Sequence, residues 1–224
     1  MKLLETQDRV VLEPDRPAQA CVIWLHGLGA DGHDFVPIVS ELRLPDELAI
    51  RYVFPHAPVR PVTLMNGMPV RAWFDILSID RMGAQDVAGI TQSQHRIDAL
   101  VAEQQAAGIA STRVLIAGFS QGGALALQTA LRYPQPLAGV LGLSTYLPME
   151  RQLADQASVA NRGLAILLQH GLYDPVLSHA LGTASRDRLR ELGYGVGWNE
   201  YPMQHEVCAE QLAPIAAFIR ERLG

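Results

Sequence analysis

The sequence has few cysteines, no basic run and no long apolar segment. Its two cysteines, Cys21 and Cys208, are too few for a disulfide framework and favour the reducing cytoplasm as its setting. Its 18 Lys and Arg residues are outnumbered by 23 Asp and Glu, which argues against nucleic acid or an anionic membrane as the main partner. No apolar segment approaches the roughly 18 residues that span a bilayer, so stable membrane insertion is not expected.

Several sequence signatures are also missing. The N-terminus has no apolar region with a cleavage site, so secretion is not supported. No group of His, Cys and carboxylate residues has metal-ligand spacing, and no phosphate-binding glycine fingerprint follows a strand. We therefore expect no metal and no cofactor. The chain contains no repeat or linker, which predicts a single domain over residues 1–224.

Apolar segments typical of strands alternate with segments of helical spacing. This alternation predicts an α/β fold, with a mainly parallel central sheet and helices on both faces. Ligands bind at the carboxyl ends of the strands in such sheets. The expected strands are 9–13, 21–25, 50–54, 114–117, 137–143, 164–169 and 196–201; the expected helices are 35–42, 86–107, 121–132, 178–192, a short one near residue 208 and 214–223.

The pentapeptide Gly-Phe-Ser-Gln-Gly at 118–122 lies between a buried strand and a small-residue helix. A G-x-S-x-G turn at such a crossing raises its serine above the sheet, and glycine on both sides allows the close approach that the turn needs. Ser120 is therefore the candidate nucleophile. A serine hydroxyl is a poor nucleophile at neutral pH, so a base and an orienting acid are required.

Three histidines follow the serine. His205 comes directly after the last strand, at the same edge of the sheet as Ser120, and fits the chain order Ser, Asp, His that accompanies this turn. His170 ends a strand and is better placed to fix the loop that carries the acid. His179 falls on a helix and is expected to be a solvated surface residue. We therefore predict His205 as the base.

Asp155, Asp174 and Asp187 are the candidate acids between the serine and His205. Asp155 lies in a segment without clear hydrophobic periodicity, and Asp187 lies on an amphipathic helix. Both positions are typical of exposed charged residues. Asp174 follows a strand and precedes Pro175. Capping that turn is the alternative role, but its loop and chain order favour Asp174 as the catalytic acid.

Acyl transfer forms an oxyanion that needs two N–H donors. One is expected from the backbone of Gln121, the residue after the serine, and the other from the loop His-Gly-Leu-Gly at 26–29. We assign the second donor to Leu28. In the alternative interpretation, the two glycines of this loop only form a tight turn.

Residues 56–82 form an irregular and unusually apolar segment, which predicts a substrate-groove loop. Leu64, Met65, Met68 and Trp73 are the candidate substrate-binding residues. In the alternative interpretation Trp73 and Phe74 fill the core, and only the methionine tip is exposed.

The segments 22–31, 73–75, 117–124, 143–148, 170–175 and 201–205 closely resemble the phospholipase/carboxylesterase family, which contains bacterial carboxylesterases and acyl-protein thioesterases, also called lysophospholipases. The resemblance runs from about residue 18 to the C-terminus. It implies an α/β-hydrolase fold, no cofactor, and hydrolysis of carboxylic esters, thioesters or lysophospholipids. It also implies the nucleophile Ser120, the acid Asp174, the base His205 and the oxyanion amides of Leu28 and Gln121. Family members often have glycine at the position of Gln204. The larger side chain of Gln204 is expected to narrow the site or tilt His205.

The resulting hypothesis is a cytoplasmic serine carboxylesterase that acts on a small-molecule or acylated substrate through an acyl-enzyme on Ser120. Because only neutral imidazole acts as a base, activity should rise through roughly pH 6–7. Self-association as a homodimer is a further expectation. The rival is a non-catalytic ligand-binding protein with the same fold. A dienelactone hydrolase is disfavoured because that family has cysteine at the turn, and a lipase because no large lid insertion is visible.

Overall fold

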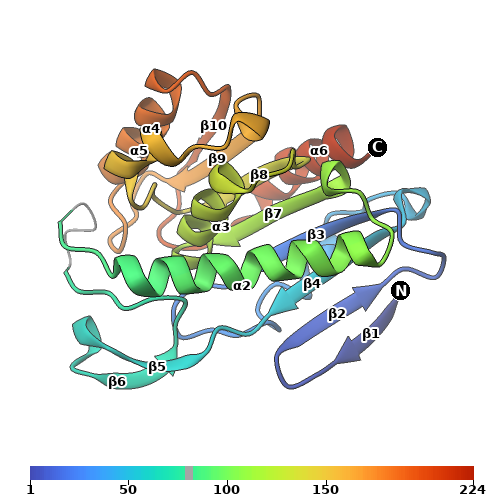
Figure 1. Ribbon diagram of the computed structural model, residues 1–224, viewed down its shortest axis with the longest axis horizontal. Coiled ribbons are helices and arrows are strands. Elements are labelled where there is room, and N and C mark those ends of the chain that lie inside the picture. Colours follow the sequence, from blue (N-terminus) through green and yellow to red (C-terminus); the bar gives the residue numbers. More distant parts are fainter. Residues whose placement is uncertain (79–82) are drawn as a thin grey trace.

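A computed structural model of the protein describes residues 1–78 and 83–224 (Figure 1). Its centre is an eight-stranded sheet with the strand order β1-β2-β4-β3-β7-β8-β9-β10. The six strands from β4 to β10 in this order pair in parallel, while β1 and β2 form an antiparallel ribbon at one edge. The predicted α/β fold with a mainly parallel central sheet is therefore confirmed.

The strands of this sheet are short and apolar. Their bounds are β1 Lys2–Glu5, β2 Arg9–Glu13, β3 Ala20–Leu25, β4 Ile50–Pro55, β7 Val114–Phe119, β8 Gly139–Leu143, β9 Ile166–Gly171 and β10 Val196–Tyr201. Every residue of β3, β8 and β9 is buried. Strands buried on both faces read as continuous apolar runs, which is why the sequence located them.

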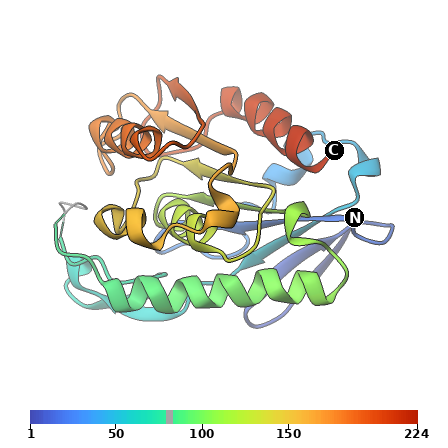
Figure 2. The same cartoon turned by 45° about the horizontal axis from the view of Figure 1, so that its top comes forward.

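Helices cover both faces of the sheet (Figure 2). Their bounds are α1 Ile38–Glu41, α2 Val87–Ala106, α3 Gln121–Arg132, α4 Glu150–Gln156, α5 His179–Glu191 and α6 Leu212–Leu223. Apolar residues of α2 to α5 share one core cluster with Ile23 and Ile116 of the sheet. Residues of α1 and α6 share a second cluster with Val22 and Leu115, whose side chains point to the opposite face.

One expected helix differs in extent from the structure, and one helix of the structure was not expected. The segment before α1 is a series of turns, and the helix begins at Ile38, directly after Pro37. The expected helix from residue 35 is thus wrong in its first turn. The helix α4 was not expected, because its seven residues bury one apolar side chain, that of Leu153, and so leave no periodic pattern.

The region 56–82 is more regular than its sequence indicates. It contains a hairpin of β5 (Val59–Val62) and β6 (Met68–Arg71), which pair antiparallel. Asn66 and Gly67 turn the chain with φ of 55° and 76°, a left-handed conformation that these two residue types tolerate best. Residues 79–82 of the predicted substrate-groove loop lie outside the described residues.

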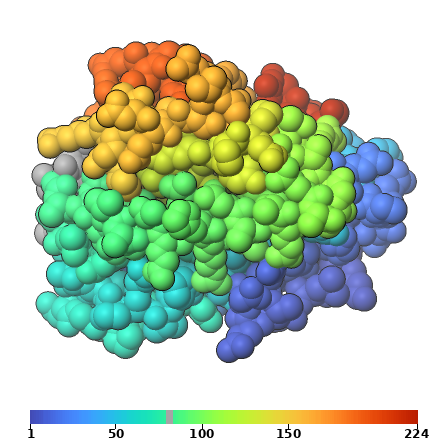
Figure 3. Space-filling model, viewed as in Figure 1, coloured from blue at the N-terminus to red at the C-terminus, as the bar shows by residue number. Residues whose placement is uncertain are grey.

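The strand β1 was also not expected. Its four residues are all exposed, and the β1–β2 ribbon (dark blue) forms a corner of the surface in Figure 3. Such a strand has no buried face, so it shows no alternation of apolar and polar residues. Backbone pairing with β2 places it instead.

Candidate active site

Ser120 stands at the crossing from β7 to α3 with φ of 54°, a region that costs a non-glycine residue free energy. Two hydrogen bonds hold this backbone: its N–H donates to the Leu143 carbonyl at 2.9 Å, and the Thr145 hydroxyl donates to its carbonyl at 2.7 Å. A Cβ at Gly122 would overlap the carbonyl oxygen of Leu25, and one at Gly118 would overlap Gly122 itself. Close packing of the turn against β3 therefore requires both glycines.

The side chain of His205 lies between Ser120 and Asp174. Its Nε2 is 2.9 Å from the Ser120 hydroxyl oxygen, and its Nδ1 is 2.7 Å from Asp174 Oδ2. The three residues follow β7, β9 and β10, whose carboxyl ends meet at one edge of the parallel sheet. The structure thus brings together the three side chains that the sequence selected. Hydrogen bonds on both sides of the imidazole fix its orientation between the carboxylate and the hydroxyl.

The carboxylate of Asp174 is buried and hydrogen-bonded on each oxygen. Oδ1 accepts from the backbone N–H groups of Val176 and Leu177, each at 2.8 Å, while Oδ2 faces His205. Burial raises the pKa of this carboxyl, but the hydrogen bonds from His205, Leu177 and Val176 outweigh it and lower the pKa below its usual value. Asp174 is therefore held as an anion beside the imidazole.

His170 fixes the loop that carries the acid, as its position at the end of β9 predicts. Its Nε2 donates to the Leu177 carbonyl at 2.8 Å, and it is buried, which lowers the pKa of its imidazole. His179 is less solvated than expected, because its Nε2 lies 2.8 Å from Glu200 Oε1. Neither of these histidines lines the cavity at Ser120.

Leu28 and Gln121, whose backbone amides the sequence assigned to the oxyanion, both line that cavity. The side chain of Gln121 has a separate role. Its Oε1 accepts from the Trp73 backbone N–H at 2.9 Å, and its Nε2 donates to the Phe74 carbonyl at 2.7 Å. These two bonds fix the first turn of α3 against the segment that follows β6.

His26 fixes the loop that carries Leu28, and its structural role was not expected. Its Nδ1 donates to the Gly27 carbonyl at 2.7 Å, and its Nε2 accepts from the Ala57 N–H at 3.0 Å. Burial lowers the pKa of its imidazole to about 4, so the ring is neutral and this proton arrangement persists at neutral pH. The indole N–H of Trp73 donates to the His26 carbonyl at 2.9 Å.

A cavity of about 230 Å³ opens beside Ser120 and His205. Its lining is mostly apolar and consists of Gly27, Leu28, Ala30, Asp34, Ile76, Phe119, Ser120, Gln121, Tyr146, Val176, Leu177 and His205. The pocket is therefore formed by the loops after β3, β7, β8, β9 and β10, together with the segment after β6.

None of the four residues that the sequence assigned to substrate binding lines this cavity. Leu64 and Met68 are exposed on the β5–β6 hairpin, and Met65 packs partly against the core. Trp73 and Phe74 are fully buried, as in the alternative that places them in the core. Trp73 supports the loop after β3 through its hydrogen bond to the His26 carbonyl, so its assignment to substrate contacts is corrected. Ile76, three residues further on, takes the place at the cavity.

Gln204 does not have the effect that its bulk suggests. Its side chain is exposed and does not line the cavity, and its backbone N–H lies 3.3 Å from Glu206 Oε1. His205 keeps both of its hydrogen bonds beside it. The expectation that Gln204 narrows the site or tilts the base is therefore wrong.

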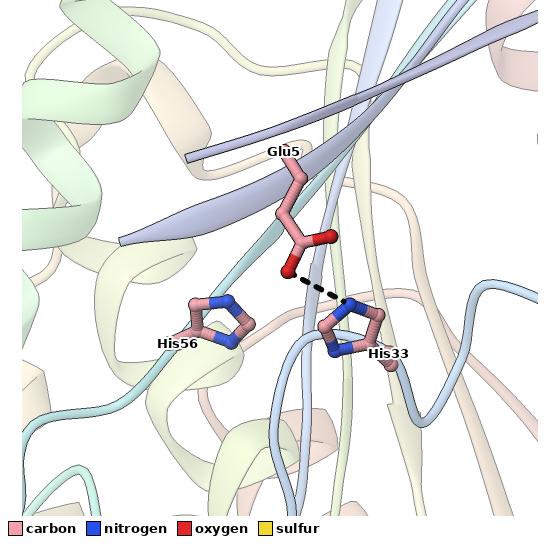
Figure 4. A group of neighbouring side chains, drawn as sticks. All are labelled: Glu5, His33 and His56. Atoms are coloured by element: carbon pink, nitrogen blue, oxygen red, sulfur yellow. Dashed lines mark ion pairs between the residues drawn. The ribbon is translucent and has the colours of Figure 1, made fainter. Parts of the chain in front are cut away.

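A separate group of side chains, Glu5, His33 and His56, converges between β1, the loop after β3 and the end of β4 (Figure 4). One ligand atom from each lies within 4.8 Å of the others, and His33 Nε2 is 3.2 Å from Glu5 Oε1. However, the Gly32 N–H donates to His56 Nδ1 at 2.9 Å, which leaves the proton of the neutral ring on Nε2. That nitrogen then has no lone pair for a metal, so we assign this group a hydrogen-bonding role. Its members come from three segments, which is why no sequence spacing revealed it.

The phospholipase/carboxylesterase family model matches residues 6–223 of the chain. Acyl-protein thioesterase 1 of Neurospora crassa is 38% identical over 213 residues, which cover 91% of this chain and 87% of that protein. Acyl-protein thioesterase 1 of Mycosarcoma maydis is 37% identical over 217 residues, which cover 90% of each. The crystal structure of Zea mays acyl-protein thioesterase 2 superposes with a TM-score of 0.86 at 30% identity and covers 96% of this chain and 99% of that chain.

Among the described residues, no helix combines the length and the apolar character that crossing a membrane requires. The parallel sheet, the serine turn at its carboxyl edge and the comparisons with known proteins all indicate the same family. The chain belongs to the phospholipase/carboxylesterase family, has the α/β-hydrolase fold and is a carboxylic ester hydrolase.

Proposed function

We propose that Ser120, His205 and Asp174 are the nucleophile, base and acid of a serine hydrolase that cleaves esters and thioesters through an acyl-enzyme. One observation carries this proposal: the imidazole of His205 lies within hydrogen-bonding distance of both the Ser120 hydroxyl, at 2.9 Å, and the Asp174 carboxylate, at 2.7 Å. A buried, ionised Asp174 stabilises the imidazolium that forms when the base takes a proton.

In the first half-reaction, Ser120 Oγ attacks the carbonyl carbon of the substrate while His205 Nε2 takes its proton. Collapse of the tetrahedral intermediate breaks the bond to the leaving group, which leaves as an alcohol or thiol with that proton. In the second half-reaction, His205 takes a proton from water, the resulting hydroxide attacks the acyl-enzyme, and the proton returns to Ser120 as the carboxylic acid leaves.

The backbone N–H groups of Leu28 and Gln121 are the proposed oxyanion donors. Gln121 begins α3, so its N–H is one of the helix-terminal donors that no carbonyl of the same helix can accept. The Leu28 N–H donates to no other residue in the described part of the chain. Both amides are thus available to an oxygen in the cavity, and the helix N-terminus adds partial positive charge there.

The proposed substrates are esters and thioesters with an apolar acyl group. Leu28, Ile76, Phe119, Val176 and Leu177 give the cavity an apolar wall next to the serine, and apolar walls bind acyl groups by removing their surface from water. The relatives named acyl-protein thioesterases support including thioesters.

Hydrolysis of p-nitrophenyl butyrate by Ser120→Ala protein tests the proposal. Activity should fall to the background rate, because no other group replaces the nucleophile. Ser40→Ala is the matched control, since Ser40 is an exposed serine that does not line the cavity. Wild-type activity in the Ser120→Ala protein would refute the assignment. Failure of the wild-type protein to react with a fluorophosphonate would favour the non-catalytic alternative.

A cytoplasmic location is also part of the proposal. Cys21 and Cys208 are both free, and Cys21 is buried in β3. Free thiols are usual where glutathione keeps cysteine reduced. Fractionation of the source cells, with the enzyme followed by fluorophosphonate labelling, tests this location.

A further inference from the structure

Among the described residues that line the cavity at Ser120, the ionisable side chains besides the Tyr146 hydroxyl are those of His205 and Asp34. His205 has a place in the proposed mechanism, whereas Asp34 has none. Asp34 follows the loop that carries Leu28; it is an exposed residue and lines the cavity. In the described part of the chain its carboxylate forms no ion pair and accepts no hydrogen bond. The described residues thus supply no partner for this carboxylate.

The surroundings of Asp34 are not arranged to neutralise it. None of the lining residues that the structure describes is Lys or Arg. Partial burial raises the pKa of the Asp34 carboxyl, and the negative charge of nearby Asp31 raises it further. Both causes mean that the ionised carboxylate is less well stabilised here than in water. A cation brought to the cavity would gain from pairing with this carboxylate, because opposite charges attract.

The same cavity is also lined by two aromatic rings, Phe119 and Tyr146. The Phe119 ring packs against the imidazole of His205, with ring centroids 4.8 Å apart, so it lies beside the reacting atoms. Aromatic faces attract organic cations such as quaternary ammonium and guanidinium groups. A carboxylate and aromatic rings around one small cavity form the combination that recognises such groups.

We propose that Asp34 is a specificity-determining residue, which makes the enzyme prefer esters and thioesters that carry an organic cation close to the scissile bond. The inference rests on the proposed function, since it places the cation in the cavity that holds Ser120. It names the substrate class by its chemistry: a quaternary ammonium of a headgroup or a basic side chain next to an acylated residue.

A matched pair of substrates tests the proposal at pH 8. Butyrylthiocholine carries a quaternary ammonium, and S-(3,3-dimethylbutyl) thiobutyrate replaces that nitrogen by carbon and is neutral. Both release a thiol that can be measured directly. The ammonium also makes the thiol a better leaving group. For each protein, kcat/KM for the cationic thioester is therefore divided by kcat/KM for the neutral thioester. This ratio is then compared between the wild-type protein and its variants.

Asp34→Asn should lower this ratio about three- to tenfold, since it removes the charge and keeps the shape. Asp34→Glu should restore most of it, which a merely structural role of Asp34 would not explain. Glu41→Gln is the control: it changes the net charge equally, but Glu41 is an exposed residue of α1 and does not line the cavity. An unchanged ratio in Asp34→Asn would overturn the proposal.

Added salt gives a second measurement that needs no variant. Raising NaCl from about 0.02 M to about 0.5 M shortens the screening length from roughly 20 Å to about 4 Å. The wild-type ratio should then fall toward that of Asp34→Asn, and a wild-type ratio that does not respond to salt would contradict the proposal even if Asp34→Asn fails to fold. If the wild-type protein hydrolyses neither thioester, that result contradicts the proposed function instead.

A second pair of substrates distinguishes the two sources of the cation. The acetylated dipeptide amide S-butyryl-Cys-Arg is compared with its counterpart that has citrulline, the neutral isostere of arginine. A ratio that depends on Asp34 for the choline pair alone assigns the cation to a headgroup. The same dependence for the arginine pair alone assigns it to a basic side chain. Dependence in neither pair overturns the role of Asp34.

Discussion

The side chain of Gln121 holds the backbone of Trp73 in place: its Oε1 accepts from the Trp73 N–H at 2.9 Å. The same side chain donates to the carbonyl of the next residue, Phe74, at 2.7 Å. Gln121 therefore joins the first turn of α3 to the segment after β6, and its own backbone N–H is one of the two proposed oxyanion donors. Gln121 thus supplies this N–H group from its backbone, and its side chain holds the first turn of α3 that carries the group.

Substitution Gln121→Met should affect both stability and activity. It leaves the backbone N–H in place but deprives two buried backbone groups of their partners, at about 1–3 kcal/mol for each group. We expect a lower midpoint in urea unfolding and about a tenfold lower kcat, because the oxyanion donor is then less well oriented. Urea titration and ester kinetics measure the two effects. Unchanged stability would show that these hydrogen bonds do not support the turn.

Asp174→Asn tests the role of the acid. The Asn carbonyl can still accept from the Val176 and Leu177 N–H groups, so the loop should remain folded. An amide N–H facing His205 Nδ1 would instead favour the wrong tautomer of the imidazole and would not stabilise the imidazolium. We expect kcat for p-nitrophenyl butyrate to fall about 10³- to 10⁴-fold. A loss below tenfold, with folding verified by circular dichroism, would remove Asp174 from the triad.

Gly122→Ala should disrupt the serine turn. The added Cβ overlaps the backbone carbonyls of Leu25 and His26, which cannot move without displacing β3 and the oxyanion loop. We expect at least a hundredfold loss of kcat/KM and a lower Tm. Gly163→Ala is the matched control, because a Cβ at that position meets nothing within 4 Å. Equal behaviour of the two variants would show that close packing does not require Gly122.

Asp98 on α2 should give a pH-dependent effect on stability. Burial raises the pKa of its carboxyl to about 6, against a weaker opposing effect of a hydrogen bond with Gln94, and its Oδ1 has no hydrogen-bond partner among the described residues. A folded-state pKa above the unfolded value of about 3.9 means that the stability contribution is present below about pH 4 and is lost as the pH rises through about 6.

Asp98→Asn should therefore stabilise the protein at pH 8 and not at pH 4. After allowance for solvent screening we expect about 1 kcal/mol, or about 2–4 °C in Tm for a chain of this size. Thermal unfolding at the two pH values measures it. Equal changes in Tm at pH 4 and pH 8 would contradict the assignment to charge burial.

The sequence predicted the sheet and the three candidate catalytic side chains because their signals are local. Buried parallel strands such as β7 and β9 are apolar runs, and Ser120, Asp174 and His205 come shortly after the ends of β7, β9 and β10. The carboxyl ends of parallel strands share one edge, so the convergence of these residues follows from chain order. The exposed strand β1 leaves no apolar pattern, and only its pairing with β2 defines it.

The walls of the site depend on contacts between distant segments, which composition does not encode. An apolar loop can fill the core or line a groove, and the two outcomes have the same sequence signal. Trp73 is buried because its indole N–H and backbone find partners in His26 and Gln121, whereas Ile76 reaches the cavity. Asp34 likewise reaches the cavity from the turns before α1, and nothing in the local sequence indicates this contact.

The central claim is that an acyl group is transferred to Ser120. Its most direct test is to mix the wild-type protein with excess p-nitrophenyl butyrate, quench in acid within the first turnovers, and locate the acyl group by peptide mass spectrometry. The account predicts one butyryl group per protein on the peptide that contains Ser120, with more of it in the Asp174→Asn protein if deacylation slows more than acylation. A butyryl group on another residue, or hydrolysis that continues in the Ser120→Ala protein at the wild-type rate, would contradict it.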